Sequence, residues 1–229
     1  QSYILDLRGN PGGLLKEAVR ICDYFLNNGS PIVTVKGSKG QNQVYSDTKR
    51  KKKKRPLIIL LDGKSASASE IVAGCLQRYH RALVVGSQSF GKGSVQQAEI
   101  LQGLPTAFDQ KMGPMLKISI AEYFVADGEP IQNRGVQSNI ELIPADLTPG
   151  NIRLIPLEIN RESDYTTKLN SQDTIKRLDI VQYDQILYVD DHAVSAGKPD
   201  IPIELCSRLL DGDGPFENED WKCNEFYSR

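Results

Sequence analysis

Three alternating serines stand where a strand is expected to end and a helix to begin. Ser65, Ser67 and Ser69 follow the apolar run Leu57–Leu61, and residues from Ala66 to Arg78 carry apolar side chains at helical spacing. Serine is a preferred helix N-cap, so capping is the ordinary role of a serine at this position. Three serines in alternation leave at least one hydroxyl for chemistry, and such a hydroxyl needs a base to become a nucleophile.

The chain offers few bases for such a serine, because it contains only two histidines. His80 falls at the far end of the helix that Ser67 would begin, at a rise of about 1.5 Å per residue. His192 follows two carboxylates in a stretch with weak structural signals. The usual Ser-His-Asp arrangement is therefore poorly supported. A lysine can serve instead when burial penalises its charged form, and Ser-Lys pairs are a known variant of the triad.

Lys92 is the candidate base. Glycines flank it in the segment Gly91-Lys92-Gly93 and allow tight backbone conformations, while Phe90 offers an apolar wall. A Gly-Lys-Gly loop can equally be a surface turn. The phosphate-loop interpretation fails because the full pattern Gly-x-x-x-x-Gly-Lys-Ser/Thr is absent.

Acyl transfer also needs hydrogen-bond donors for the tetrahedral oxyanion, and these are usually backbone N–H groups. The turn from Gly9 to Gly13 ends one predicted strand and opens a helix. The amide of Gly13 and that of Ala68, directly after Ser67, would make such a pair of donors. A plain strand-to-helix turn without a ligand is the alternative at this position.

The elements that position these residues alternate between strand and helix. This order predicts an α/β fold with a mostly parallel sheet flanked by helices, to which a half-exposed strand at Lys117–Phe124 adds further β structure. The polar stretch from Lys36 to Arg55 is predicted to be an exposed excursion. The expected elements of the core are strands at Tyr3–Leu7, Ile32–Val35, Leu57–Leu61 and Ala82–Val85, and helices at Leu14–Phe25 and Ala66–Arg78.

The chain is expected to divide into three parts. Residues 1–148 form a partial core, residues 149–211 form a smaller C-terminal portion packed on it, and residues 212–229 form a tail. The C-terminal portion is predicted to contain a strand at Gln185–Val189 and a helix at Ile201–Leu210. The first residues run into an apolar strand without an initiator Met, so we expect the sequence to be a piece of a longer protein.

Composition argues against several classes of partner. The formal net charge is −1, which gives no electrostatic reason to expect nucleic acid. No run approaches the roughly 18 apolar residues of a membrane span. The four cysteines form no CxxC pair, so neither a zinc site nor thioredoxin-like chemistry is expected. A Ser-Lys mechanism requires neither a metal nor an organic cofactor. Cys22 and Cys75 are predicted to be buried free thiols, and a disulfide between Cys206 and Cys223 stays open.

The segments LDLRGNPGG, SASASEIVAG and GSQSFGKGSVQQ, in this order, resemble the core motifs of carboxyl-terminal processing (tail-specific) serine peptidases. The similarity runs from about residue 3 to residue 145 and implies a ClpP/crotonase-like core. By this resemblance Ser67 is the nucleophile, Lys92 is the base, and Gln96, one helical turn later in the motif, orients the lysine. Gly13 and Ala68 match the oxyanion donors of the family.

The resemblance also implies partners and a location. Substrates would be proteins with apolar C-terminal tails, and an extended peptide could add to the edge of the strand Lys117–Phe124. A PDZ domain normally precedes LDLRGNPGG in the family, and it is missing from this sequence together with the first strands of the core. An oligomer is possible, and an extracytoplasmic location, the bacterial periplasm, is expected. Arg78 stands where some bacterial members carry an Asp, so the role of that Asp is not carried over.

Two other functions compete with the peptidase. A non-catalytic peptide-binding scaffold could have kept the fold, although the intact Ser67, Lys92 and Gln96 argue against it. An enzyme similar to enoyl-CoA hydratase would share the core and its glycine-turn donors. The GKGSVQ loop has no evident role in that chemistry.

Overall fold

The computed structural model describes residues 2–27, 29–37, 40–48, 55–100, 115–126, 128–148, 151–155, 161–164, 184–189 and 200–211. Its first sheet has the strand order β1-β4-β5-β9-β10, and β11 also pairs with β9. Every described pairing in this sheet is parallel except that between β9 and β10, so the predicted mostly parallel sheet is confirmed. These strands are β1 (Tyr3–Asp6), β4 (Leu57–Leu61), β5 (Leu83–Gly86), β9 (Ile140–Thr148), β10 (Asn151–Leu154) and β11 (Asp184–Val189).

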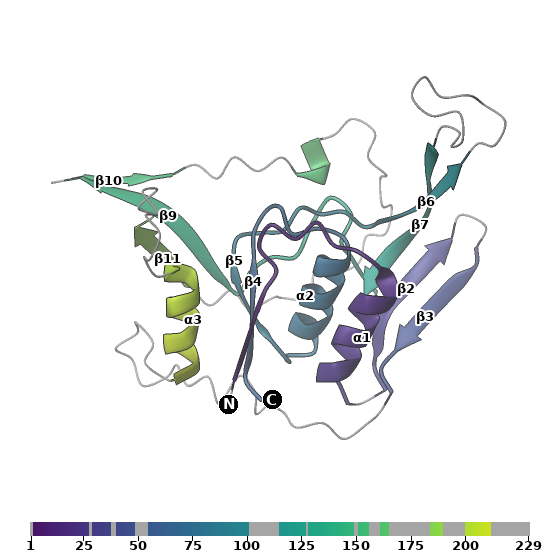
Figure 1. Cartoon of the computed structure of the whole chain (residues 1–229), viewed down its shortest axis with the longest axis horizontal. Coiled ribbons are helices and arrows are strands. Elements are labelled where there is room, and N and C mark those ends of the chain that lie inside the picture. Colours follow the sequence, from purple (N-terminus) through teal and green to yellow (C-terminus); the bar gives the residue numbers. More distant parts are fainter. Residues whose placement is uncertain are drawn as a thin grey trace.

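The second sheet is antiparallel and has the order β3-β2-β7-β6, with β8 added beside β7. It corresponds to the expected additional β structure. Figure 1 shows that helices α1 and α2 lie between the two sheets, and that α3 lies on the other face of the first sheet. The strands are β2 (Pro31–Gly37), β3 (Asn42–Ser46), β6 (Ser94–Ile100), β7 (Met115–Val125) and β8 (Glu129–Pro130). The helices are α1 (Leu15–Phe25), α2 (Ala68–Arg78) and α3 (Ile201–Asp211).

Strand β4 joins the two halves of the core. Its residues are all apolar and buried, as expected for a strand of a parallel sheet that is covered on both faces. Leu57, Ile59 and Leu61 belong to the cluster formed with α1, α2 and the second sheet. Ile58 and Leu60 belong to the cluster that α3 covers through Cys206 and Leu209. The alternation of side chains along one strand therefore builds both cores.

One expectation about the β structure is incomplete and another is wrong. The stretch from Lys36 to Arg55 is mostly exposed where it is described, as predicted, but it contains the strand β3, which is held by backbone pairing with β2 rather than by apolar burial. The strand predicted at Lys117–Phe124 is not the outer strand of its sheet. In the structure it is β7, which lies between β2 and β6, so β6 and β3 are the edge strands of that sheet in the described part of the chain.

The C-terminal elements agree with the prediction where they are described. The predicted strand and helix appear as β11 and α3, whereas residues 212–229 lie outside the described residues. Cys22, Cys75 and Cys206 are buried free thiols, and Cys223 lies outside the described residues. None of the described helices is long and apolar enough to cross a membrane.

The topology brings the three sequence motifs to one place. Strands β1, β4 and β5 are parallel neighbours, so their carboxyl ends meet at the same edge of the sheet. The glycine turn follows β1, the serine segment follows β4 and the lysine loop follows β5. The carboxyl edge of an open α/β sheet is where ligands usually bind.

Candidate active site

Ser67 occupies a strained turn between β4 and α2. Its backbone has φ 57° and ψ −115°, a conformation that a residue with a side chain adopts only at a cost of about 1–3 kcal/mol. Helix α2 begins at the next residue, Ala68, so Ser67 stands at the N-cap position. The backbone N–H of Ser67 donates to Oε2 of Glu70 at 2.7 Å. The side chain of Glu70, in the first turn of the same helix, therefore stabilises this strained backbone conformation.

The glycine turn packs directly against the serine turn. Gly12 has φ 94°, and a Cβ at this position would lie 2.5 Å from the carbonyl oxygen of Ala66 and 2.7 Å from the nitrogen of Ala68. Only glycine permits this approach. The Asn10 carbonyl oxygen accepts the Ala66 N–H at 3.0 Å and the Ser69 hydroxyl at 3.1 Å. The two turns thus form one connected structure.

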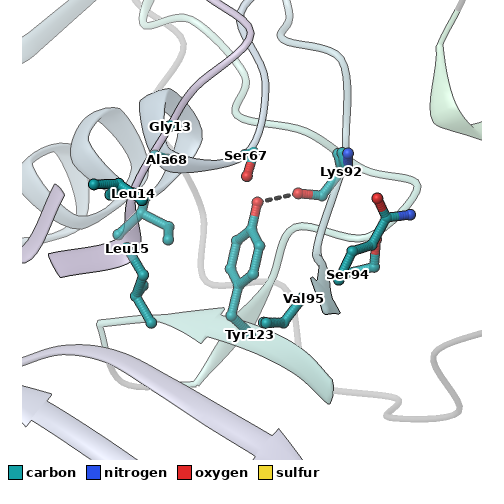
Figure 2. Close-up of a pocket in the computed structure, with 11 residues that line it drawn as sticks. Gly13, Leu14, Leu15, Ser67, Ala68, Lys92, Ser94, Val95 and Tyr123 are labelled. Carbon is teal, nitrogen blue, oxygen red and sulfur yellow. Dashed lines mark hydrogen bonds between the residues drawn. The ribbon is translucent and has the colours of Figure 1, made fainter. Parts of the chain in front are cut away.

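Two backbone N–H groups in this structure remain available. The first N–H groups of a helix have no partner within the helix. Those of Ser69 and Glu70 donate to the carbonyl oxygens of Ala66 and Ser67. The N–H groups of Ala68 and Gly13 donate to no atom among the described residues. Gly13, Ser67 and Ala68 all line one pocket of about 330 Å³ (Figure 2).

Lys92 lines the same pocket from the loop that follows β5, and its side chain is half-buried. Figure 2 shows the hydroxyl of Tyr123, on β7, between Ser67 and Lys92. This hydroxyl donates to the carbonyl oxygen of Lys92. Burial raises the pKa of Tyr123 well above its ordinary value, so the hydroxyl stays protonated and can donate. No hydrogen bond joins the amine of Lys92 to the Ser67 hydroxyl, both of which belong to the described part of the chain.

Glu70 connects the serine turn with the lysine loop. Its carboxylate is fully buried and accepts four hydrogen bonds, which come from the backbone N–H groups of Ser67, Gly91 and Lys92 and from the Ser89 hydroxyl. Burial raises the pKa of Glu70 to about 7, although the four hydrogen bonds act in the opposite direction. A buried carboxylate at a helix start is thus shared between two segments that are distant in the sequence.

Gln96 lies in the pocket wall, but not as expected. Residues 94–100 form the strand β6, so Gln96 is not one helical turn beyond Lys92. Antiparallel pairing with β7 imposes the extended conformation on this segment. Gln96 is exposed and contributes to the pocket from the edge of the second sheet.

Arg78 and the histidines lie away from the pocket or outside the described residues. Arg78 is at the opposite end of α2 from Ser67 and pairs with Glu129 at 3.7 Å. His80 follows the same end of that helix, as predicted. His192 is not among the described residues. In the described ranges, no three His, Cys, Asp or Glu side chains are grouped so that they could hold a metal ion.

Sequence reasoning missed two residues of this site, Glu70 and Tyr123. Glu70 carried a usable signal, because a Glu three residues after an N-cap serine is the pattern of a capping box. That pattern predicts the contact with Ser67 but not those with the lysine loop. Tyr123 carried no signal, since nothing in the sequence distinguishes it from other aromatic residues of a half-buried strand.

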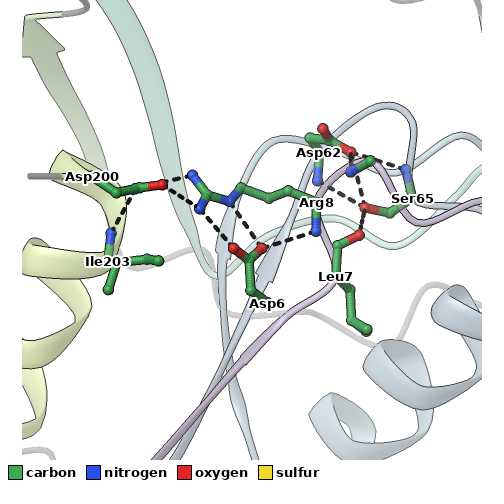
Figure 3. A network of polar contacts seen from close by, with 8 residues as sticks. Asp6, Leu7, Arg8, Asp62, Ser65, Asp200 and Ile203 are labelled. Carbon is green, nitrogen blue, oxygen red and sulfur yellow. Dashed lines mark hydrogen bonds and ion pairs between the residues drawn. The ribbon is translucent and has the colours of Figure 1, made fainter. Parts of the chain in front are cut away.

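A polar network holds the start of the glycine turn (Figure 3). The guanidinium of Arg8 donates to Asp6 and to Asp200, each at 2.7 Å. Asp200 also accepts the N–H of Ile203 in the first turn of α3, at 3.1 Å. The Ser65 hydroxyl donates to the Leu7 carbonyl oxygen at 2.8 Å. The end of β1 is therefore tied both to the serine segment and to the C-terminal helix.

Glu70 is expected to make the stability of the fold depend on pH. Its pKa is about 7 in the fold against an ordinary 4.5, so between these values the folded chain holds a proton that the unfolded chain has released. The free energy of unfolding should therefore fall as the pH rises from about 4.5 to about 7, by on the order of 3 kcal/mol. Denaturant unfolding of wild type and Glu70→Gln isolates this contribution, since Gln does not titrate.

The stability of wild type relative to Glu70→Gln should decline from about pH 5 to about pH 7 and level off above the folded-state pKa. A relative stability that rises over this range would mean that the carboxyl group has a lowered pKa in the fold.

Comparison with known proteins identifies a family and several relatives that match a little over 60% of the chain. The sequence model of the family described as Peptidase family S41 matches residues 1–142. A carboxy-terminal-processing protease of Bartonella bacilliformis is 42% identical over 142 residues, which cover 61% of this chain and 30% of that protein. The carboxy-terminal processing protease CtpA of Bacillus subtilis is 34% identical over 141 residues, which cover 62% of this chain and 28% of that protein.

A solved structure shares the fold over part of the chain. The photosystem II D1 C-terminal processing protease superposes with a TM-score of 0.50 and 29% identity, over 60% of this chain and 33% of that one. This chain thus spans less than a third of the length of the two relatives named above. Helix α3 lies beyond the residues that the family model matches.

Proposed function

This chain belongs to peptidase family S41, whose model matches residues 1–142, and on that premise we propose that it is a serine endopeptidase that cuts proteins near their C-termini. Ser67 is the nucleophile in this proposal, and Lys92 is the general base. The observation that carries the proposal is the meeting of a strained serine, two available N–H groups and a lysine around one pocket. Each of these parts has a defined role in acyl transfer.

The proposed reaction proceeds through an acyl-enzyme. The amine of Lys92, acting as general base, takes the proton of the Ser67 hydroxyl while Oγ attacks the carbonyl carbon of the scissile peptide bond. The N–H groups of Gly13 and Ala68 donate to the resulting oxyanion. The lysine then passes its proton to the leaving amine, the C–N bond breaks, and water hydrolyses the ester in a second cycle of the same steps.

The first step requires the lysine side chain to approach Ser67, because the structure has no hydrogen bond between them. Catalytic hydrogen bonds are often formed only when substrate is bound. A lysine side chain has four rotatable bonds, whereas the backbone of Lys92 is anchored on both sides of its Cα by Glu70 and Tyr123. The approach is therefore a change of rotamer rather than a movement of the loop.

Substrates with apolar C-terminal tails suit the walls of this pocket. Leu14, Leu15, Ile71 and Val95 line it beside Ser67. The edge strand β6 contributes Ser94, Val95 and Gln96, so an extended substrate would add to β6 rather than to β7. As the family resemblance implies, a PDZ domain of the same protein would select the tail, and the protein would act outside the cytoplasm, in the bacterial periplasm.

Covalent labelling of Ser67 tests the proposal. The purified protein is treated with a fluorophosphonate, which reacts with activated serines, and the adduct is located by peptide mass spectrometry. We expect the adduct on Ser67, and we expect Ser69→Ala, a serine of the same turn, to keep it. An adduct confined to other residues, or none at all, would favour the non-catalytic peptide-binding scaffold.

A further inference from the structure

Each of the two carboxylate oxygens of Glu70 accepts two hydrogen bonds. Oε2 accepts the N–H of Ser67 at 2.7 Å and the N–H of Lys92 at 3.0 Å. Oε1 accepts the N–H of Gly91 and the hydroxyl of Ser89, both at 2.6 Å. One oxygen atom therefore binds the backbone of both proposed reactants. The other oxygen holds the residues that lead into the lysine.

These contacts exceed what helix capping requires. A capping box uses one bond from the glutamate side chain to the N-cap backbone, and its carboxylate normally stays at the surface. Glu70 is instead fully buried, which is costly for a carboxylate unless hydrogen bonds compensate it. Three of its four donors belong to the segment after β5, which lies about 20 residues further along the chain. Glu70 therefore joins the serine turn to the lysine loop, in addition to capping helix α2.

The backbone of Lys92 is fixed on both sides of its Cα. Its N–H donates to Glu70, and its carbonyl oxygen accepts from Tyr123. The neighbouring Phe90 N–H donates to the Ser65 carbonyl oxygen at 3.0 Å, which adds a direct link between the two segments. The flexible part of the lysine is therefore its side chain, while its point of attachment is held at a set distance from Ser67.

We propose that Glu70 is a positioning residue for the peptidase reaction, which holds the backbone of Ser67 and the backbone of Lys92 in the relative placement that proton transfer requires. This inference rests on the proposed function, because it assigns Glu70 a role in that same site. Glu70 itself does not contact the substrate and exchanges no proton in the reaction. Losing it moves the reactants apart rather than removing one of them.

The test compares wild type with Glu70→Gln in the purified protein, with a fluorogenic peptide that ends in apolar residues as substrate. Gln offers a single oxygen, and its NH₂ group would face backbone N–H donors, so the shared acceptor is lost. We expect kcat per folded molecule to fall by about 10²-fold while KM stays within about threefold, because displacements near 1 Å have effects of this size. The folded fraction is taken from unfolding curves.

Asp47→Asn is the matched control. Asp47 is also a buried carboxylate, and it accepts the backbone N–H groups of Gly29 and Ser30 at 2.7 and 3.0 Å, away from the pocket. We expect this variant to lose stability and to keep kcat per folded molecule. If the role of Glu70 were merely structural, Glu70→Gln would likewise lose stability and keep its kcat per folded molecule.

The outcomes separate the positioning role from the proposed function. A wild type that neither cleaves the peptide nor takes a label on Ser67 overturns the proposed function. If wild type cleaves the peptide and the kcat per folded molecule of Glu70→Gln stays within about twofold of it, the positioning role alone is overturned.

If Glu70→Gln does not fold, Ser89→Ala provides a second test. It removes one of the four donors to Glu70, and we expect about a tenfold lower kcat with KM retained. An unchanged kcat in Ser89→Ala then overturns the positioning role.

Discussion

Ser67→Ala is expected to lower the kcat of peptide cleavage by about 10⁴-fold or more, to the level of contaminating activity. In the proposed mechanism the substitution removes the atom that forms the covalent intermediate, and neither Ser65 nor Ser69 of the same segment lines the pocket. The backbone N–H of residue 67 keeps its bond to Glu70, so the turn should persist. Alanine meets the same backbone strain as serine at φ 57°.

The measurement is kcat and KM on a peptide ending in apolar residues, together with the midpoint of denaturant unfolding. We expect the midpoint to stay close to that of wild type, because the hydrogen bonds of a single hydroxyl at a helix start contribute about 1 kcal/mol. Cleavage that persists at more than about 1% of the wild-type rate would remove Ser67 from the mechanism.

Lys92→Ala is expected to reduce kcat by a comparable factor, about 10³–10⁴-fold, because general-base catalysis by a positioned side chain contributes on this scale. The loop itself should survive, since the N–H and carbonyl oxygen of residue 92 keep their bonds to Glu70 and Tyr123. Alanine also vacates space in the pocket beside Ser67. A small primary amine such as ethylamine should therefore restore part of the activity. The restored rate should increase with the concentration of the unprotonated amine.

Lys64→Ala provides the control for this prediction. Lys64 is an exposed lysine in the turn before the serine segment, so its loss changes the charge by the same amount without touching the pocket. We expect Lys64→Ala to keep kcat within about twofold. Equal losses in both lysine variants would point to an effect of net charge, and an unchanged kcat in Lys92→Ala would show that another group takes the proton.

Much of the parallel core could be predicted because its signals are local. Leu57–Leu61 is a continuous apolar run between turn residues, which is the pattern of a strand buried on both faces, and it is β4. The helices after Ser67 and after Gly13 follow from apolar residues at helical spacing. Errors arose where pairing between distant segments decides the structure. β3 is mostly exposed, and Gln96 is extended only because β6 pairs with β7.

The sequence by itself determined which residues are candidates for the proposed chemistry: a serine at a helix start, a lysine between glycines, and a glycine turn. Residue type and short-range spacing suffice for that, since they govern nucleophilicity, backbone freedom and helix starts. Only the tertiary structure decided that Glu70 and Tyr123 fix the backbone of Lys92 beside Ser67, and that β6 is the edge strand that lines the pocket. These contacts join segments that meet through strand order and burial, and such long-range pairing leaves no signal in the spacing of neighbouring residues.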